Sequence, residues 1–261
     1  MKIIDFHTHV YPDSIAERGS KSISDFYGIP HSCIGSVDVL SERSKMAGIS
    51  LSLLLPVALK AENVRHINEF TAQAVKSHTE FSGFGSIHAD MDNILEEVEG
   101  ICELGLKGIK LHPDIQGFPI DDERLYPVYD AIAGRLPVVI HCGDPRYDHS
   151  RPERLRRVLD AFPKLQVVGA HLGGWSMFEK AFEYLCDTDC CFDFSSCMMF
   201  LGRDETKRYI NRYGADRILF GTDFPLWDPV TEVNRFMSLE LGSEEMEKIA
   251  YRNAERFLGT R

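Results

Sequence analysis

Residues 3–9 read Ile3-Ile4-Asp5-Phe6-His7-Thr8-His9, an apolar run that ends in two histidines. Alternate side chains of a β-strand share a face, so His7 and His9 point the same way, about 6.6 Å apart along the strand. Two imidazoles at this spacing can bind one transition-metal ion. The run therefore predicts a strand whose carboxyl end carries metal ligands.

The composition is that of a globular protein. The 261 residues, 44% of them hydrophobic, fit one α/β barrel and are too few for two such domains. The charged fraction of 26% is ordinary for a folded chain. A net charge of −11 argues against a nucleic-acid or anionic-membrane partner, because phosphates need a basic surface. We therefore expect a small-molecule partner, and a homodimer is compatible with the sequence.

The seven cysteines form no disulfide framework, and the chain begins with a strand instead of a signal-like segment. No apolar run reaches the length of a transmembrane helix. These features predict a cytoplasmic protein. Cys186, Cys190, Cys191 and Cys197 cluster in the sequence, but their spacing matches no zinc motif, so we interpret them as core residues.

Apolar runs alternate with segments of helical period along the chain. The predicted strands, mostly continuous runs as in sheets covered on both faces, are residues 3–6, 50–56, 81–88, 107–111, 137–141, 166–170, 190–194 and 217–221. The predicted helices are residues 37–47, 62–77, 92–104, 123–134, 152–161, 175–186, 204–213, 230–239 and a closing helix through 258. Residues 10–36 are predicted to be an irregular insertion.

Eight strand–helix units allow either a closed barrel or an open, doubly wound sheet. The first strand is followed by no Gly-x-Gly-x-x-Gly motif, and the sequence contains no phosphate-binding loop. A barrel is favoured because it brings all eight strand ends to one site. The sequence thus predicts a distorted (β/α)₈ TIM barrel forming a single domain over 1–261, with the insertion at its active-site face.

Ionisable residues gather where the predicted strands end. Six of the ten histidines lie there, namely His7, His9, His88, His112, His141 and His171, and Asp223 follows the eighth strand. Catalytic divalent ions take three or four nitrogen or oxygen ligands and keep one position for water. We predict His7, His9, His141 and Asp223 as ligands, with Asp223 also accepting a proton. Hydrogen-bonded side chains at strand ends explain His88 and His112 equally well.

Two further buried positions have open roles. Lys110 lies in the fourth predicted strand, where a metal ion repels an ammonium group. Carbamylated, it would bridge two ions, with His141 and His171 as ligands of the second. Otherwise it binds a substrate anion or pairs with an acid such as Asp114, and we favour this reading with one ion. Asp5 is predicted to be a buried acid that supports a ligating histidine.

The loop after the fifth strand carries two arginines. Arg146 and Arg151 can clamp a substrate carboxylate through bidentate hydrogen bonds, or pair with Asp144 and Asp148 and fix the loop. His112 and Trp175 are further candidate substrate-binding residues. The tryptophan can equally pack a helix on the barrel.

The strand-end residues belong to motifs that occur in order along the chain: Asp5-Phe6-His7-Thr8-His9, Gly108-Ile109-Lys110-Leu111-His112-Pro113, Val139-Ile140-His141, Gly169-Ala170-His171-Leu172-Gly173-Gly174, Phe220-Gly221-Thr222-Asp223-Phe224-Pro225, and the closing residues 249–258. Together they resemble the amidohydrolase superfamily, specifically the amidohydrolase-related branch that includes aminocarboxymuconate-semialdehyde decarboxylase and its relatives.

The resemblance implies a distorted barrel with His7, His9, His141 and Asp223 as ligands, and His171 as a neighbouring group that orients or polarises. It also implies a divalent ion, for which we expect Zn, with Mn, Fe or Ni as alternatives. We expect hydrolysis, in which activated water attacks an amide, lactone or ester carbon of a small carboxylate-bearing substrate, with Asp223 and His171 catalytic. The alternative is non-oxidative decarboxylation of an aromatic or unsaturated carboxylic acid, because the superfamily contains both activities.

Overall fold

The computed structural model describes residues 1–259, so the last two residues of the predicted domain, 260–261, lie outside the described part. All eight predicted strands are present, each shorter than expected except the first. They are β1 (Ile4–Thr8), β2 (Leu51–Leu54), β3 (Phe81–Gly83) continuing into β4 (Gly85–Ser86), β5 (Ile109–Leu111), β6 (Val138–Ile140), β7 (Val167–Gly169), β8 (Cys191–Asp193) and β9 (Ile218–Leu219).

The strands form a closed parallel barrel. β1, β2 and β3 pair in that order, and β4 to β9 pair in sequence. Phe84 joins the two sheets: its N–H donates to Leu54 O at 3.0 Å, and the next N–H, of Gly85, donates to Gly108 O at 2.8 Å. The other seam closes where Phe6 N–H donates to Phe220 O at 2.8 Å. The predicted (β/α)₈ TIM barrel is confirmed.

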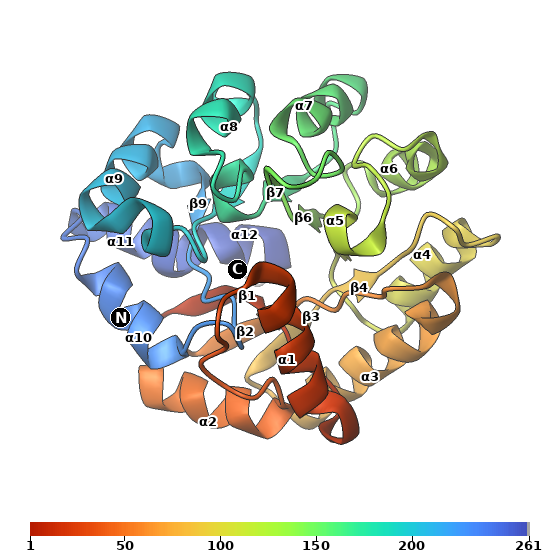
Figure 1. Ribbon diagram of the computed structural model, residues 1–261, viewed down its shortest axis with the longest axis horizontal. Coiled ribbons are helices and arrows are strands. Elements are labelled where there is room, and N and C mark those ends of the chain that lie inside the picture. The colour runs from red at the N-terminus through yellow and green to blue at the C-terminus, as the bar shows by residue number, and fades with distance from the viewer. Residues whose placement is uncertain (260–261) are drawn as a thin grey trace.

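Apolar side chains from the strands of the ring other than β5 pack together with those of the closing helix. This cluster includes Phe6, Leu53, Phe84, Val139, Val168 and Leu219, with Ala254 and Leu258 of α12 (Asn253–Leu258). A TIM barrel needs such a filled interior, because it is a packed core and not a pore. Figure 1 shows α12 near the middle of the barrel.

The predicted helices form the outer ring (Figure 1). They are α2 (Val37–Ala47), α3 (Val64–Ser77), α4 (Ile94–Glu103), α6 (Tyr126–Ile132), α7 (Pro152–Ala161), α8 (Phe178–Leu185), α9 (Met198–Tyr213) and α10 (Pro229–Met237). Local sequence explains several boundaries. Ser36 caps the start of α2 by accepting from Val39 N–H, and Gly48, with φ 72°, ends it. The closing helix is split into α11 (Ser243–Glu247), a π-helical turn (Lys248–Arg252) and α12.

The prediction that residues 10–36 are irregular is wrong in part, because they contain α1 (Ala16–Tyr27). The helix escaped prediction because it is polar on average: Gly19 and three serines separate the few apolar residues that carry its helical period. It follows β1 directly and lies in front of the barrel in Figure 1, where it extends over the middle of the face. A short helix, α5 (Pro113–Gln116), also lies at this face.

The cysteines behave largely as predicted. All seven are free thiols, and Cys190, Cys191 and Cys197 are buried, whereas Cys186 is half-buried. Among the described residues, no helix is both long and apolar enough to cross a bilayer.

Candidate metal centre

Three of the four predicted ligands converge at the carboxyl end of the barrel. His7 Nε2 lies 3.2 Å from His9 Nε2. Asp223 Oδ1 lies 3.7 Å from the first of these nitrogens and 3.5 Å from the second. The barrel seam produces this meeting, because β1 and the segment after β9 are neighbours and Asp223 N–H donates to His7 O at 2.8 Å.

Hydrogen bonds on the far side of each ring fix which nitrogen faces the centre. His7 Nδ1 lies 2.9 Å from Asp193 Oδ2, and His9 Nδ1 lies 2.7 Å from the Leu55 carbonyl. Both partners are acceptors, so both Nδ1 atoms carry the proton and both Nε2 atoms present lone pairs. Two lone pairs and a carboxylate oxygen facing one another are repulsive unless a cation lies between them. The donor set therefore fits a divalent metal ion.

Asp223 is held as a carboxylate. Burial raises its pKa, but His9, His7 and His171 outweigh burial, and the pKa lies well below the usual value. Its Oδ2 accepts a short hydrogen bond from Ser196 Oγ, which in turn accepts from Trp227 Nε1 at 2.8 Å, so Oδ1 is left for the centre. Asp223 adopts a left-handed backbone, φ 61°, which costs energy for a non-glycine residue and is often found at functional sites.

His141 and His171 form an adjoining pair. His141 Nδ1 lies 3.1 Å from His171 Nε2, and the ring of His171 stacks on His7 with centroids 5.0 Å apart. His171 Nδ1 lies 2.9 Å from Ser195 O, so a neutral His171 presents a lone pair at Nε2. Neutral His171 thus suits a ligand or base, and it can donate to an oxyanion only when both nitrogens are protonated. His141 stays a predicted ligand.

Asp193 is a functional candidate that the sequence analysis missed. It is fully buried at the end of β8, holds His7 Nδ1 through Oδ2, and accepts from Ser195 Oγ through Oδ1 at 2.5 Å. Burial raises its pKa, but the two histidines and Ser195 more than compensate, so the pKa is lowered. His7, His171 and Asp193 are also close enough to hold an ion. Because hydrogen bonds already occupy these atoms, we assign Asp193 to orienting His7.

Lys110 is completely buried beside the centre. Its Nζ lies 3.2 Å from His7 Nε2, and burial lowers its pKa to about 8, although Asp193 and Asp223 oppose the shift. In the described part of the chain Lys110 has no carboxylate within 4 Å, so the alternative pairing with Asp114 is not formed. A buried ammonium without a counterion favours an anion supplied from outside.

Asp5 is a buried acid, as predicted. It accepts from Thr222 Oγ1 at 2.6 Å, from Thr222 N–H at 2.9 Å and from His7 N–H at 3.2 Å. Burial outweighs these hydrogen bonds and raises its pKa to about 7. Asp5 therefore ties the ligand-bearing end of β1 to the segment that carries Asp223.

Tyr27, from α1, is a second residue that the sequence analysis missed. Its hydroxyl lies 2.7 Å from His112 Nε2 and 3.4 Å from His141 Nε2. His112 stacks on His141, with centroids 3.9 Å apart and planes 9° from parallel. His112 Nδ1 and Asp114 Oδ1 are buried without hydrogen-bond partners among the described residues. These polar atoms next to the metal ligands are available to a substrate.

The two arginines are paired with acids of their own loop. Arg146 binds buried Asp144 through two nitrogens, at 2.7 and 3.0 Å, and Arg151 Nε lies 3.0 Å from Asp148 Oδ1. These contacts match the alternative in which the arginines fix their own loop. A contact between either arginine and a substrate carboxylate stays a prediction. Trp175 is buried against Tyr27, with ring centroids 4.8 Å apart, at the edge of the same cluster.

His88 lies outside this arrangement. Its Nδ1 accepts from Asp90 N–H at 3.2 Å, and its ring packs edge-on against Phe118. It is therefore a hydrogen-bonded residue at the end of a strand, which is one of the two readings of its sequence position.

A family model described as amidohydrolase matches residues 4–260 of the chain. The chain belongs to the amidohydrolase family. The predicted superfamily is thereby confirmed. This amidohydrolase is similar to the structure of an uncharacterised TIM-barrel protein from Bordetella bronchiseptica, with 25% identity and a TM-score of 0.79 over 99% of both chains.

Two further solved structures show how varied proteins with this fold are. A dihydroxybenzoic acid decarboxylase from a Polaromonas species, with bound manganese and an inhibitor, has 17% identity and a TM-score of 0.76, over 99% of this amidohydrolase and 97% of that chain. A probable 2-pyrone-4,6-dicarboxylic acid hydrolase from Acinetobacter baumannii has 14% identity and a TM-score of 0.71, over 99% and 100%. At these identities the likeness establishes the fold alone.

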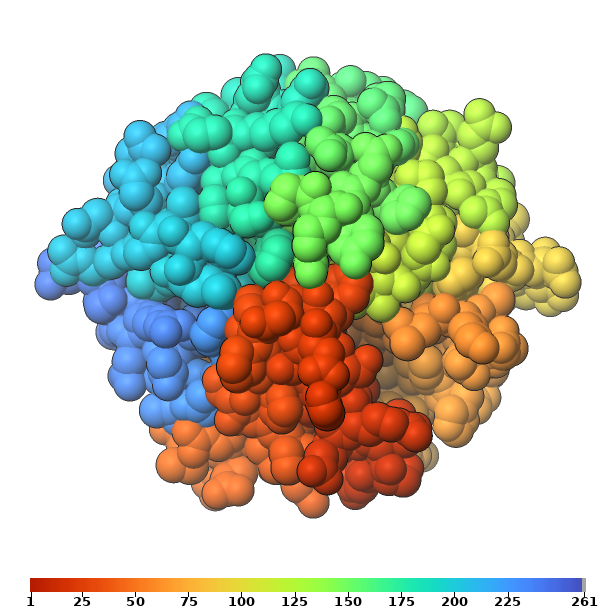
Figure 2. Space-filling view, in the orientation of Figure 1, coloured from red at the N-terminus to blue at the C-terminus, as the bar shows by residue number. Residues whose placement is uncertain are grey.

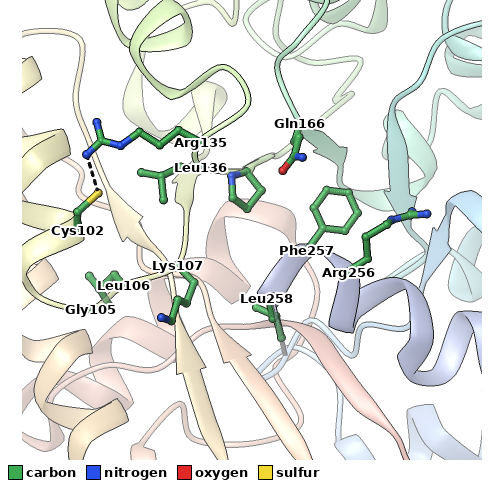
Figure 3. A pocket seen from close by; sticks show the side chains of 12 residues that line it. Cys102, Gly105, Leu106, Lys107, Arg135, Leu136, Gln166, Arg256, Phe257 and Leu258 are labelled. Atoms are coloured by element: carbon green, nitrogen blue, oxygen red, sulfur yellow. Dashed lines mark hydrogen bonds between the residues drawn. The ribbon is translucent and has the colours of Figure 1, made fainter. Parts of the chain in front are cut away.

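A pocket also lies at the opposite, amino end of the barrel (Figure 3). Lys107, Pro137 and Gln166, which precede β5, β6 and β7, line it together with the end of α12. Arg135 at its edge pairs with Glu99 at 2.5 Å and contacts Cys102 Sγ at 3.4 Å. The described lining residues include no histidine or carboxylate, so they supply no metal ligands of the kind found at the carboxyl end.

Proposed function

We propose that the protein is a metal-dependent hydrolase that cleaves an amide, ester or lactone bond of a small, carboxylate-bearing molecule. The observation that supports this proposal most is the convergence of His7 Nε2, His9 Nε2 and Asp223 Oδ1, each with its proton-bearing or hydrogen-bonded side turned away from the centre.

The proposed ion is held by His7, His9 and Asp223, with His141 as the fourth ligand. A divalent ion bound there would activate a water molecule and polarise the carbonyl that is attacked. Nitrogen and carboxylate ligands suit Zn, which we propose, and they also accept Mn, Fe or Ni. Of the two arrangements at Lys110, we propose a single ion and an unmodified lysine.

The ionised state of Asp223 is the one from which hydrolysis starts. A general base must be unprotonated when the reaction starts, and the lowered pKa of Asp223 keeps it so. We propose that its Oδ1 accepts the proton of the attacking water and passes it to the leaving group. His171, once protonated at Nε2, donates to the oxygen that gains negative charge.

The substrate carboxylate is proposed to face Lys110. Its buried ammonium has no carboxylate partner in the described structure, and an anion beside it would neutralise the charge. Tyr27, His112 and Trp175 would then line the remainder of the substrate site, next to the unpartnered Nδ1 of His112.

Decarboxylation is the second candidate, favoured by two observations. Several solved structures with this fold are decarboxylases of hydroxylated aromatic acids, two of them with bound manganese. Lys110 could hold the carboxylate that leaves as carbon dioxide. That reaction requires an acid to protonate the carbon left behind, and an Asp223 that stays ionised is poorly suited to this step.

One assay separates the two reactions. The zinc- or manganese-loaded protein is incubated with carboxylated esters, amides and lactones, pyrone dicarboxylates first, and in parallel with hydroxybenzoic acids. Hydrolysis is expected to produce an acid without releasing bicarbonate or carbon dioxide, and to depend on Asp223. Release of carbon dioxide from an aromatic acid, with no hydrolysis across the panel, would establish the decarboxylase instead.

A further inference from the structure

The metal centre is enclosed except at His9, whose side chain is 14% exposed. His7 and His141 are each 1% exposed, His171 is 2% exposed, and Lys110 is not exposed at all. A carboxylate-bearing substrate cannot contact buried side chains of this kind unless some part of the surrounding structure moves. The segment that covers the site is therefore the place to look for that motion.

α1 is that covering segment. In Figure 2 the red N-terminal segment spreads over the middle of the face and meets the green segment that follows β6. Its last residue, Tyr27, contacts His112 and His141 directly. A substrate that reaches these histidines must displace the phenol or fit beside it.

The two halves of α1 are held very differently. The first half is anchored: Ala16 and Ser20 are buried, Ser20 Oγ accepts from Gly35 N–H at 2.7 Å, and Gly19 packs against the ring of Tyr11. In the second half Lys21, Ser22 and Asp25 are exposed, and the packing comes from the rings of Phe26 and Tyr27. Because this half depends on two side chains and on the residues that hold them, its opening costs less free energy than opening of the anchored first half.

Arg146 fastens this second half. Its Nη1 donates to the Phe26 carbonyl at 2.7 Å, in the last turn of α1, where carbonyls lack helical partners and the helix dipole favours a cation. Its guanidinium also lies 5.0 Å from the centroid of Phe26, whose ring stacks on Tyr147 of the same loop. Buried Asp144 fixes the other edge of the guanidinium.

We propose that residues 21–27 of α1 are a lid over the metal centre, that Arg146 is its latch, and that Tyr27 is a substrate-positioning residue which the closed lid brings to His112 and His141. In this proposal Arg146 binds the lid, and the carboxylate of Asp144 keeps the Arg146 guanidinium in place. The role of Tyr27 rests on the proposed function, whereas the latch can be tested without any substrate.

The test is amide hydrogen exchange of the zinc-loaded full-length protein, compared with Arg146→Ala, Arg146→Lys and Tyr27→Phe. Losing the carbonyl contact and the cation–π contact is expected to speed exchange of residues 21–27 by about tenfold in Arg146→Ala. Arg146→Lys, which keeps the charge but not the planar fork, is expected to fall between. Exchange in β6 and in the buried first half of α1 should not change.

Arg151→Ala is the matched control, because Arg151 lies in the same loop and also pairs with an aspartate, but among the described residues no hydrogen bond, ion pair or cation–π contact joins it to α1. It should leave exchange of residues 21–27 as in the parent. Zinc transfer to an added chelator gives a second readout. It should accelerate in Arg146→Ala and Tyr27→Phe, less in Arg146→Lys, and not in Arg151→Ala. Exchange of residues 21–27 that is as slow as in β6, or that is insensitive to Arg146, would overturn the lid. So would acceleration that spreads through the barrel.

Discussion

The two ends of the barrel differ in what they bury. At the carboxyl end, histidines, carboxylates and one lysine are withdrawn from water, and their hydrogen bonds turn lone pairs toward a common centre. At the amino end, the pocket beside α12 is lined by apolar atoms and by cations that keep one side in solvent, such as Arg135 paired with Glu99. Burying charge is costly, so a fold does so where the arrangement serves chemistry.

This difference agrees with the general division of labour in TIM barrels, where the carboxyl face carries catalysis and the opposite face stability. The same strands contribute to both ends. β5, for example, follows solvent-exposed Lys107 and carries the buried Lys110 within three residues. Substitutions at the carboxyl end should therefore have larger effects on metal binding and turnover than substitutions at the amino end.

The largest expected effect is on turnover. Asp223→Asn removes the proposed proton acceptor and one charged ligand but keeps the size of the side chain. Turnover is expected to fall by roughly 10²–10⁴-fold, while the circular dichroism spectrum stays that of the folded parent. Measurable activity at the parental level in a metal-loaded variant would exclude the assigned role.

The second effect is on the pH dependence of stability. Burial raises the pKa of Glu232, in the first turn of α10, to about 7 despite Arg235. The folded protein binds the Glu232 proton more tightly than the unfolded chain, in which the carboxyl pKa is 4.5. The free energy of unfolding is therefore highest below pH 4.5 and falls as the pH rises to about 7. Glu232→Gln is therefore expected to be more stable than the parent by about 3 kcal/mol at pH 8 and equal to it near pH 4.

Denaturant unfolding at several pH values measures this difference. Glu99→Gln, at the amino end, is the control with the opposite sign. The hydrogen bond from Arg135 lowers the pKa of exposed Glu99, so the parent is the more stable protein at neutral pH and the difference vanishes as the pH falls. If Glu232→Gln became less stable than the parent as the pH rose, burial would not be the cause of the raised pKa of Glu232.

The third effect is on metal affinity. Asp193→Asn keeps a hydrogen-bond acceptor for His7 Nδ1 but removes the negative charge that orients and polarises the ring. Zinc affinity, measured by competition with a chelator, is expected to fall by about 10–100-fold. Asp216→Asn, an exposed aspartate paired with Lys248, should bind zinc like the parent. Equal zinc affinities for the two variants would exclude a role of Asp193 in orienting His7.

The smallest effect is expected at the amino end. Arg135→Ala breaks the exposed pair with Glu99 and opens the edge of the pocket in Figure 3. Surface ion pairs contribute about 0–1 kcal/mol, so the unfolding free energy should change by no more than this. Zinc content and turnover should match the parent. A loss of turnover in Arg135→Ala would show that the amino end also contributes to catalysis.

The barrel could be predicted from the sequence because the signals for its strands and helices are local. Continuous apolar runs mark strands covered on both faces, and the strand-end histidines follow directly from them. Sequence reasoning missed Asp193 because a single acid inside the predicted strand 190–194 gives no sign of the histidine that it meets in space. It missed Tyr27 because α1 is polar on average and its few apolar residues are separated by serines and charged residues. It also could not choose between substrate and loop contacts for Arg146, since that choice depends on Asp144 and α1 meeting in space.

The central claim is that His7, His9 and Asp223 hold a divalent ion. Metal analysis of the protein after equilibration with zinc and removal of free metal tests it most directly, with His9→Ala prepared in parallel. We predict one ion per chain in the parent and far less than one in the folded variant. A parent chain that retains no divalent metal, or a variant that retains as much as the parent, would contradict the account.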